Sequence, residues 1–343
     1  MYVSRSAAPP RTRIAGIGAY LPATERTSAE SEDRIRGSGI SIPHGFIERS
    51  TGVRSRRIAG PGENASDLAV AAARQALGAS GIPVEEIDLL VFCSASHDVT
   101  EPATANIVQA KLGARNAATF DLKNACNSLL SAVDVADAYV RLGRARVALV
   151  ATGEVPSLVT SLEFASREDL VTNFAHVTMG DAGGALVLCA AESASQGILA
   201  TAWINRGEAW ELGTVLGGGT MHPYEREHLV LRPRSAELEA HGRRDIPSVV
   251  AGVLEAAEWR PETVDVFACH QHSQRITGEL LRVLGIDPER APRPLRYAGN
   301  AASANVALAL AQAHEEGRLA PGRRVLLCGG SAGFSAIATA VSW

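Results

Sequence analysis

The sequence predicts an α/β fold made of two similar halves, and three observations lead to this prediction. Apolar segments of strand length alternate with segments in which apolar residues recur every three to four positions, the spacing of one helix face. The segment Leu89–Cys93 is apolar throughout, as expected for a parallel strand that is covered on both faces. The third observation is an internal repeat.

The second part of the chain repeats the first at a nearly constant spacing. Glu255–His270 matches Ala79–His97 as a helix end, a turn with Pro and Glu, and an apolar strand preceded by Asp. Asn300–Gly330 matches Asn124–Gly153 as a helix, a Gly-Arg turn and an apolar strand. Corresponding positions in both matches lie about 177 residues apart. We therefore expect two βαβ-type halves related by pseudo-symmetry.

The halves are expected at 14–195 and 196–343, after a flexible N-terminal tail at 1–13. The tail is polar, contains two adjacent prolines and lacks the apolar core of a signal peptide. Strands are predicted where short apolar runs are bounded by Asp, Gly or Pro, and helices where the apolar spacing is helical. The predicted strands are Ile14–Leu21, Leu89–Cys93, Ala118–Leu122, Val147–Ala151, Ala185–Cys189 and Val264–Cys269. The predicted helices include Ser66–Gly78, Thr104–Leu112, one that begins near Cys126 and one opened by Asn300.

Three segments lack a clear period. Thr24–Gly45 is polar and loosely helical, and Glu154–Thr178 is mixed in polarity, as in an excursion over an active site. Trp203–Gly242 is rich in Gly, His, Trp and Arg and has the character of an insertion that shapes a pocket.

The composition limits the classes of function. The chain has 343 residues, of which 46% are hydrophobic and 20% charged, so a large core is possible. A net charge of −4 without a basic stripe gives no case for nucleic-acid binding. No apolar run reaches the roughly 18 residues that span a bilayer. Five cysteines without CxxC spacing indicate neither a disulfide framework nor a zinc site, which suits a reducing cytoplasm.

A cysteine between a predicted strand and a predicted helix is the first candidate for chemistry. Cys126 stands at the start of a helix, where unpaired backbone N–H groups and the positive end of the helix dipole favour the thiolate. Most free cysteines are small buried hydrophobes, so position alone does not decide the matter.

A histidine and an asparagine from the second half complete the candidate site. His270 follows the strand Val264–Cys269, and Asn300 follows a Tyr-Ala-Gly turn. In α/β folds the loops at the carboxyl ends of strands form the site, and a duplicated fold brings the loops of both halves to one centre. We therefore expect Cys126, His270 and Asn300 to be neighbours, although each residue type alone is more often structural.

Six segments in order resemble the motifs of the thiolase-fold condensing enzymes, in particular β-ketoacyl-(acyl carrier protein) synthase III, over nearly the whole chain. They are Ile47–Arg57, Asp121–Leu130, Met179–Leu188, His270–Ile276, Gly299–Ala304 and Gly330–Ser335. The resemblance implies a thiolase fold, in which two pseudo-symmetric halves form five αβαβα layers. It also implies a homodimer.

The resemblance further implies that Cys126, His270, Asn300 and Gly333 are catalytic. Cys126 would attack an acyl thioester and hold the acyl group, and the backbone N–H groups of Cys126 and Gly333 would bind the oxyanion. His270 and Asn300 would donate hydrogen bonds to the enolate that forms when a malonyl-type thioester loses CO2. No tightly bound cofactor is implied, because acyl-CoA or an acyl carrier protein thioester is the substrate.

The segments that the family uses to bind CoA are altered in this chain. Phe46 stands where the family has Trp, and Ser50 and Asn173 stand where it has CoA-binding arginines. The loss of these charges weakens the case for binding of the CoA phosphates, so a carrier-protein thioester is at least as good a candidate for the donor. The candidates for binding the donor are Phe46, Arg49, Arg54 and Arg275, of which Arg275 could meet an acidic carrier protein. The changes indicate a specialised homologue, as in polyketide or other secondary-metabolite biosynthesis.

Three other functions stay open at this point. Relatives transfer the acyl group from cysteine to a hydroxyl or amine, in which case His270 would be a general base. Asn300 favours condensation, because simple transfer forms no enolate. A Cys–His–Asn hydrolase is disfavoured by the internal repeat, and a catalytically silent subunit is disfavoured by the intact Cys126.

A metal site is not expected. His222, Glu225 and His228 lack the i, i+4 spacing of a zinc-binding helix, and Pro223 disfavours a helix there.

Overall fold

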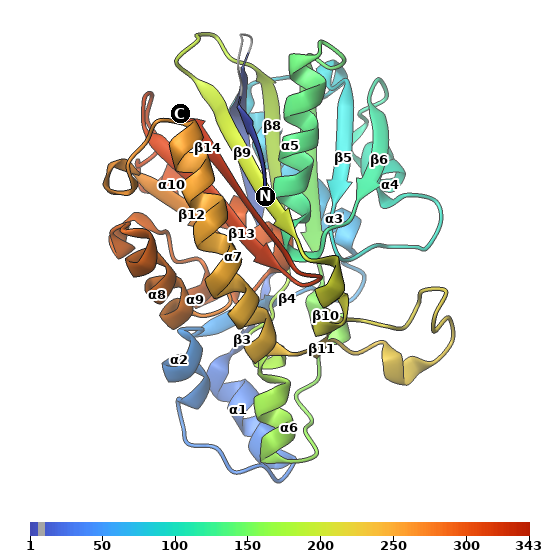
Figure 1. Cartoon of the computed structure of the whole chain (residues 1–343). Helices are drawn as coiled ribbons and strands as arrows, with labels where there is room; N and C mark the ends of the chain where they lie inside the picture. Colours follow the sequence, from blue (N-terminus) through green and yellow to red (C-terminus); the bar gives the residue numbers. More distant parts are fainter. Residues whose placement is uncertain (6–10) are drawn as a thin grey trace.

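The computed structural model describes residues 1–5 and 11–343, and the strands of this part of the chain form two five-stranded sheets and two short two-stranded sheets (Figure 1). The first sheet contains β2 (Thr12–Tyr20), β5 (Leu89–Cys93), β6 (Ala118–Leu122), β7 (Val147–Glu154) and β8 (Ala182–Ala190). Their spatial order is β2-β8-β7-β5-β6. β5 is parallel to β6 and β7, and β8 is antiparallel to β7 and β2.

The second sheet has the order β1-β9-β14-β13-β12. It contains β1 (Tyr2–Arg5), β9 (Gly197–Asn205), β12 (Val266–Cys269), β13 (Arg324–Ser331) and β14 (Ser335–Ser342). β12 is parallel to β13, and the other neighbours are antiparallel. The strands of the first sheet all precede residue 191, and those of the second sheet, with the exception of β1, all follow residue 196. We propose the gap 191–196 as the boundary of the two halves.

Helices separate and cover the two sheets in five layers. One pair packs on the outer face of the first sheet, one pair lies between the sheets, and one pair covers the second sheet. The pair on the outer face of the first sheet is α3 (Ala65–Ser80) and α4 (Thr104–Leu112). The pair between the sheets is α5 (Ser128–Arg141) and α10 (Asn305–Glu315), and the pair on the second sheet is α7 (Ser235–Ala256) and α8 (Gln274–Leu284). The αβαβα arrangement that the sequence predicts is confirmed.

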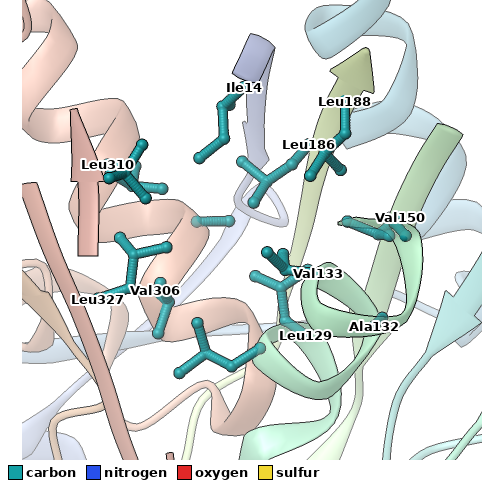
Figure 2. Packing of buried hydrophobic residues seen from close by; sticks show 14 of the residues in the cluster. Ile14, Leu129, Ala132, Val133, Val150, Leu186, Leu188, Val306, Leu310 and Leu327 are labelled. Carbon is teal, nitrogen blue, oxygen red and sulfur yellow. The ribbon is translucent and has the colours of Figure 1, made fainter. Parts of the chain in front are cut away.

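The central layer carries the main core. Leu129 and Val133 of α5, Val306 and Leu310 of α10, and Leu327 of β13 belong to one buried cluster that both sheets enclose (Figure 2). Because close-packed side chains allow little movement, this cluster fixes the amino-terminal ends of α5 and α10 relative to each other. Those two ends carry the candidate site.

The predicted duplication is present in the backbone. The 3-10 turn η2 (Ala125–Asn127) precedes α5, and the 3-10 turn η9 (Ala302–Ala304) precedes α10. Ala125 and Ala302 both have positive φ angles, 46° and 45°, an uncommon conformation for a residue other than glycine. The two turns lie at the spacing of about 177 residues seen in the sequence, so Ser303 occupies the position in the second half that Cys126 occupies in the first.

The prediction of a flexible tail at 1–13 is corrected at both ends. Tyr2–Arg5 forms β1, which pairs with β9, and the Tyr2 ring lies 5.6 Å from that of Trp203. Thr12 and Arg13 belong to β2. The physical reason is that β9 would otherwise be an edge strand with unpaired backbone groups. The remainder of the predicted tail, 6–10, lies outside the described residues.

Three short helices form a cap at one end of the two sheets, seen at the bottom of Figure 1. They enclose a small cluster that includes Ile35, Ile47 and Leu170. A two-stranded antiparallel sheet connects them to the large sheets. The helices are α1 (Ser28–Gly37), α2 (Phe46–Thr51) and α6 (Arg167–Thr172), and the strands are β3 (Thr24–Thr27) and β4 (Ser55–Ile58).

The predicted insertion is shorter than expected. Its first residues complete β9 and its last ones begin α7, and the segment between them contains the hairpin of β10 (Gly213–Thr214) and β11 (Arg232–Pro233). A one-turn helix, α9 (Leu295–Ala298), precedes Asn300. Every helix in the described part of the chain is too short or too polar to cross a bilayer.

Candidate functional site

Cys126 lies in the turn η2, between β6 and α5. The Ser128 hydroxyl holds this turn, because it accepts a hydrogen bond from the Asn124 N–H (2.8 Å) and donates one to the Ala125 carbonyl (2.7 Å). The side chain of Cys126 is half-buried. The predicted position next to a helix start is confirmed, with one 3-10 turn in between.

The charge state of Cys126 differs from the sequence-based prediction. Burial and the nearby Glu154 carboxylate raise the pKa of the Cys126 thiol to about 12, against the opposing effect of its own backbone N–H and of the Ser331 hydroxyl. The helix start does favour the thiolate, but desolvation outweighs it. In the resting protein Cys126 is therefore a thiol at physiological pH.

Glu154 is a buried carboxylate beside the candidate nucleophile, with 1% of its surface exposed. It accepts hydrogen bonds from the Ala95 N–H (3.1 Å), the Ser96 hydroxyl (3.3 Å) and the Ser303 hydroxyl (2.5 Å). Burial raises its pKa, and the hydrogen bonds from Ser303 and Ala95 act in the opposite direction. Through Ser303, Glu154 connects the first half of the molecule to the turn η9 of the second.

His270 follows β12, and its ring lies against the turn η9. Nδ1 lies 3.1 Å from the Ala302 carbonyl oxygen and 3.0 Å from the Asn305 amide nitrogen Nδ2. Burial, reinforced by His272, lowers the pKa of His270 to about 3, so the ring is neutral at physiological pH. A neutral imidazole has one N–H, and the two contacts therefore correspond to two tautomers. With hydrogen on Nδ1 the ring donates to Ala302, and with hydrogen on Nε2 it accepts from Asn305.

Asn300 is fixed by hydrogen bonds to both its backbone and its side chain. Its Oδ1 accepts from the Ala302 N–H and from Asn305 Nδ2, each at 3.1 Å. Its backbone N–H donates to the Thr178 carbonyl (2.8 Å), and its carbonyl accepts from the Gly180 N–H (3.1 Å). Because Oδ1 already accepts two hydrogen bonds, the side chain has its Nδ2 hydrogens left to offer.

The prediction that Asn300 opens a helix is wrong by several residues. The helix α10 begins at Asn305, and the turn η9 intervenes. The reversal of the chain at Ala302, with its positive φ, delays the helix and lets Asn300 pair with Met179 in an isolated bridge.

Gly333 lies in the turn between β13 and β14 and has a φ of 108°, a conformation that favours glycine. The space where a Cβ would stand is open. The Ser331 hydroxyl donates to the Asn124 carbonyl (3.2 Å), which attaches this turn to the segment before Cys126. On the other side, Arg206 and Phe334 exchange backbone hydrogen bonds of 2.8 and 3.1 Å.

The structure brings the elements that carry the four predicted catalytic residues together. The turn η2 packs against both η9 and β13. Asn305, buried at the start of α10, places its Nδ2 within hydrogen-bond distance of His270, Asn300 and the Gln271 carbonyl, and its two hydrogens serve two of these three acceptors at a time. His270 and Asn300 therefore contact one shared amide. The result is a set of a thiol, a neutral imidazole, an amide donor and a glycine turn on adjoining segments.

Three of the residues predicted to bind the thioester donor lie on two helices that pack together, Phe46 and Arg49 on α2 and Arg275 on α8. The fourth, Arg54, lies between α2 and β4. Phe46 is half-buried, with its ring edge-on to Phe174 at 5.7 Å. Arg49 is exposed and donates to the His44 carbonyl (2.6 Å), and Arg54 is exposed. Arg275 is exposed and forms an ion pair with Glu279 at 2.5 Å. Their role stays a prediction.

No group of three His, Cys, Asp or Glu side chains in the described residues has the geometry to hold a metal ion. The His222 and His228 rings do lie 4.0 Å apart, and Glu225 is 3.8 Å from His222.

Asn305, Glu154 and Ser303 are the site residues that the sequence did not reveal. Ser303 could have been found, because the repeat spacing places it opposite Cys126. Asn305 and Glu154 carry no local signal, since their contacts come from segments far away in the chain.

Comparison with known proteins agrees with this fold. Models for "3-Oxoacyl-[acyl-carrier-protein (ACP)] synthase III" and for the C-terminal part of that family match residues 120–207 and 254–343. The chain is 36% identical to a β-ketoacyl-[acyl-carrier-protein] synthase III of Rhodospirillum rubrum over 95% of this chain and 97% of that protein. A protein of the same description from Rhodospirillum centenum is 36% identical over 98% of this chain and 100% of its own length.

Solved structures show the same likeness. The 3-oxoacyl-[acyl-carrier-protein] synthase III of Aquifex aeolicus superposes with a TM-score of 0.85 at 29% identity, covering 97% of this chain and 100% of that one. OleA of Xanthomonas campestris superposes with a TM-score of 0.87 at 27% identity, covering 97% and 98%.

The fold, the arrangement of the site and these relatives define a condensing enzyme of the thiolase-fold class. Within that class, the chain belongs to the 3-oxoacyl-[acyl-carrier-protein] synthase III family.

Proposed function

We propose that this protein loads an acyl group from a thioester onto Cys126 and condenses it with a malonyl-type thioester. The observation that supports this best is the shared contact of Asn305 with His270 and Asn300. A hydrogen bond from Asn305 to Nδ1 of His270 places the ring hydrogen on Nε2. His270 and Asn300 then both act as donors, and two donors are what an enolate oxygen requires.

In the first step the Cys126 sulfur attacks the thioester carbonyl. The sulfur–carbon bond to Cys126 forms, the bond to the donor thiol breaks, and the thiol proton of Cys126 leaves with the donor sulfur. The backbone N–H groups of Cys126 and Gly333 are proposed to hold the oxyanion of the tetrahedral intermediate. With a pKa of about 12, the Cys126 thiol must lose its proton during this attack rather than before it.

In the second step a malonyl-type thioester loses CO2, and the electron pair of the broken bond moves into an enolate. Nε2–H of His270 and Nδ2–H of Asn300 stabilise its oxygen. The enolate carbon then attacks the acyl carbon on Cys126, the Cys126 sulfur leaves as a thiolate, and it takes up a proton from water to restore the thiol. The product is a β-ketoacyl thioester.

The contact between His270 Nδ1 and the Ala302 carbonyl supports a second candidate function. In that tautomer Nε2 carries a lone pair, and His270 is a general base for a hydroxyl or amine acceptor. Acyl transfer without carbon–carbon bond formation would follow. The two functions therefore differ in the position of one hydrogen atom.

Acyl loading followed by product analysis tests both candidates. The protein is incubated with a panel of acyl-CoA and acyl-carrier thioesters, and the intact mass shows whether Cys126 is acylated, with Cys126→Ala as the control. A malonyl-type thioester is then added. Release of CO2 with a β-keto product supports condensation, and an intact ester or amide supports transfer. Steady thioester hydrolysis without an acceptor, or no adduct on Cys126, contradicts both.

We further propose that the partner in this reaction is an acyl carrier protein, that the protein acts as a homodimer in the cytoplasm, and that it works in polyketide or other secondary-metabolite biosynthesis. The altered CoA segment supports the specialised role, because Ser50 and Asn173 lack the charge that CoA phosphates require. The five cysteines are all free, which fits a reducing compartment. Light scattering and loading from a carrier-protein thioester check the assembly and the donor.

A further inference from the structure

A cavity of about 610 Å³ lies beside α1, on the flank of the cap. Its walls are the carboxyl end of α1, the paired strands β3 and β4, the segment 157–163, and His176 and Met179. This volume is in the range of small-molecule binding sites. The residues predicted to bind the CoA part of the donor do not line it.

Three arginines give this cavity a strongly cationic wall. Arg26 of β3 and Arg56 of β4 lie directly opposite each other in the antiparallel strand pair. Arg34 of α1 is exposed at the rim of the cavity. Like charges in directly opposite positions of two strands destabilise the pairing. Against the three arginines, the lining contains one acid, the exposed Glu163.

Arg56 is buried without a counter-ion. Only 1% of its surface is exposed, its Nη2 donates one hydrogen bond to the Ser28 hydroxyl (2.9 Å), and its buried Nε has no partner. Within the described residues no carboxylate lies at ion-pair distance from it. Burial and Arg26 lower the pKa of Arg56 to about 10. Burying an unpaired cation costs free energy, and a bound anion that pairs with the cation offsets this cost.

The two carboxylates whose charges act on Arg26 are already engaged. Asp181, whose charge acts on Arg26, accepts hydrogen bonds from the Ala59 N–H (2.7 Å) and from the N–H (3.0 Å) and hydroxyl (2.6 Å) of Ser157. Glu30 also acts on Arg26, but its carboxylate is held by the N-cap of α1. The guanidinium groups that face the cavity are therefore left for a ligand.

We propose that this cavity binds the oxyanion group of a small-molecule substrate, and that the group is the carboxylate of an acidic acyl chain or acceptor. Guanidinium groups pair with carboxylate and phosphate through two parallel hydrogen bonds. A carboxylate fits better than a CoA phosphate because the innermost cation, Arg56, is almost fully buried. Arg56 lies beside Met179 in the cavity lining, and the backbone of Met179 pairs with that of Asn300. The link to the substrate rests on the proposed function, whereas anion binding does not.

Calorimetry with simple anions tests the site without any chemistry. In the Cys126→Ala protein, succinate and inorganic phosphate are expected to bind and butyrate at least tenfold more weakly than succinate. Arg56→Met and Arg34→Gln should each weaken succinate binding, Arg56→Met by at least tenfold. Arg115→Gln, an exposed arginine outside the cavity, is the matched control and should bind like the parent. Equal binding by the parent and Arg56→Met overturns the proposal.

Thermal unfolding shows whether Arg56 serves binding or structure. Without ligand, Arg56→Met should unfold at the same temperature as the wild type or higher, because the substitution removes an unpaired buried charge. With saturating succinate, the wild type should gain stability and Arg56→Met should not. A large loss of stability in ligand-free Arg56→Met means that the arginine is structural and contradicts the proposal.

Acylation rates separate the two sources of the oxyanion. Succinyl and butyryl thioesters of N-acetylcysteamine carry no phosphate. If the wild type prefers the succinyl thioester by about tenfold and Arg56→Met loses this preference, the substrate carboxylate binds in the cavity. If instead the preference for CoA over N-acetylcysteamine thioesters is what Arg56→Met loses, the oxyanion is a donor phosphate. Loss of neither preference refutes the assignment to substrate. Absence of any Cys126 adduct would contradict the proposed function and leave the calorimetric result standing.

Discussion

Replacing Asn305 by leucine should move the hydrogen of His270 from one ring nitrogen to the other. Leucine has a similar shape but no donor, so the 3.0 Å contact from Nδ2 to the ring is lost. The 3.1 Å contact from Nδ1 to the Ala302 carbonyl remains, and it requires hydrogen on Nδ1. Nε2 then carries a lone pair and cannot donate to an enolate.

The size of the effect follows from the hydrogen bonds that are lost. Removal of one preorganised donor to a developing oxyanion typically lowers the rate by about 10²–10³. Decarboxylation of a malonyl-type thioester by Asn305→Leu should therefore fall by about that factor. Acylation of Cys126 does not use this donor in the proposed mechanism and should change less than tenfold. The variant also leaves the Ala301 N–H without a partner, which costs about 1–3 kcal/mol of stability, and it removes the third acceptor contact of Nδ2, to the Gln271 carbonyl.

Two assays are required for this prediction. Labelling with ¹⁵N-histidine and NMR identifies the protonated ring nitrogen of His270, which His270→Gln assigns among the nine histidines. Radiolabelled CO2 release gives the decarboxylation rate, measured well below the unfolding midpoint. Asn116→Leu, which removes an exposed amide that donates to the Glu85 carbonyl, is the matched control. The reasoning is refuted if the wild type already carries hydrogen on Nδ1, or if Asn305→Leu keeps hydrogen on Nε2.

Three further predictions concern Cys126, Gly333 and Asp245. Because burial and Glu154 raise the pKa of Cys126 to about 12, its alkylation by iodoacetamide should rise about tenfold per pH unit through pH 10; a plateau near pH 7 would contradict this. Gly333→Ala, at a φ of 108°, should lower stability by about 1–3 kcal/mol in urea unfolding and slow acylation; wild-type values for both would show that the turn tolerates a Cβ. Arg206 and Arg244 hold the pKa of Asp245 well below its usual range, so its stabilisation is present above pH 4 and is lost as the pH falls through the folded-state pKa. Asp245→Asn should therefore be destabilised at pH 7, with a gap to the wild type that narrows in acid; a gap independent of pH would exclude ion pairing as the cause.

Local patterns were sufficient for the strands and the duplication. Leu89–Cys93 and Ala118–Leu122 have their predicted bounds because each is a short run between residues that end strands. The repeat spacing is as visible in the backbone at Ala125 and Ala302 as it is in the sequence. Such features depend on neighbours in the chain, and so the chain alone predicts them.

The errors arise where tertiary contacts override a local preference. The helix start next to Cys126 predicts a thiolate, but burial and Glu154, which comes from another strand, reverse the charge state. A turn with a positive φ at Ala302 separates Asn300 from its helix, and no residue pattern marks that turn. The arginines of the segment 46–57 were visible in the sequence, but which of them is buried depends on the cap that covers Arg56.

Cys126 and His270 are both neutral in the resting site, and burial is the main cause of both pKa shifts. With a thiol pKa of about 12 and an imidazole pKa of about 3, neither group carries a charge at neutral pH, so a thiolate–imidazolium ion pair is not the resting state. A neutral His270 keeps one lone pair and one N–H, so it can serve a reaction in which charge first appears on the substrate. An imidazolium would donate from both nitrogens, and the choice that Asn305 makes between tautomers would have no consequence. The burial that keeps His270 neutral is thus the condition under which one amide can determine the chemistry of this site.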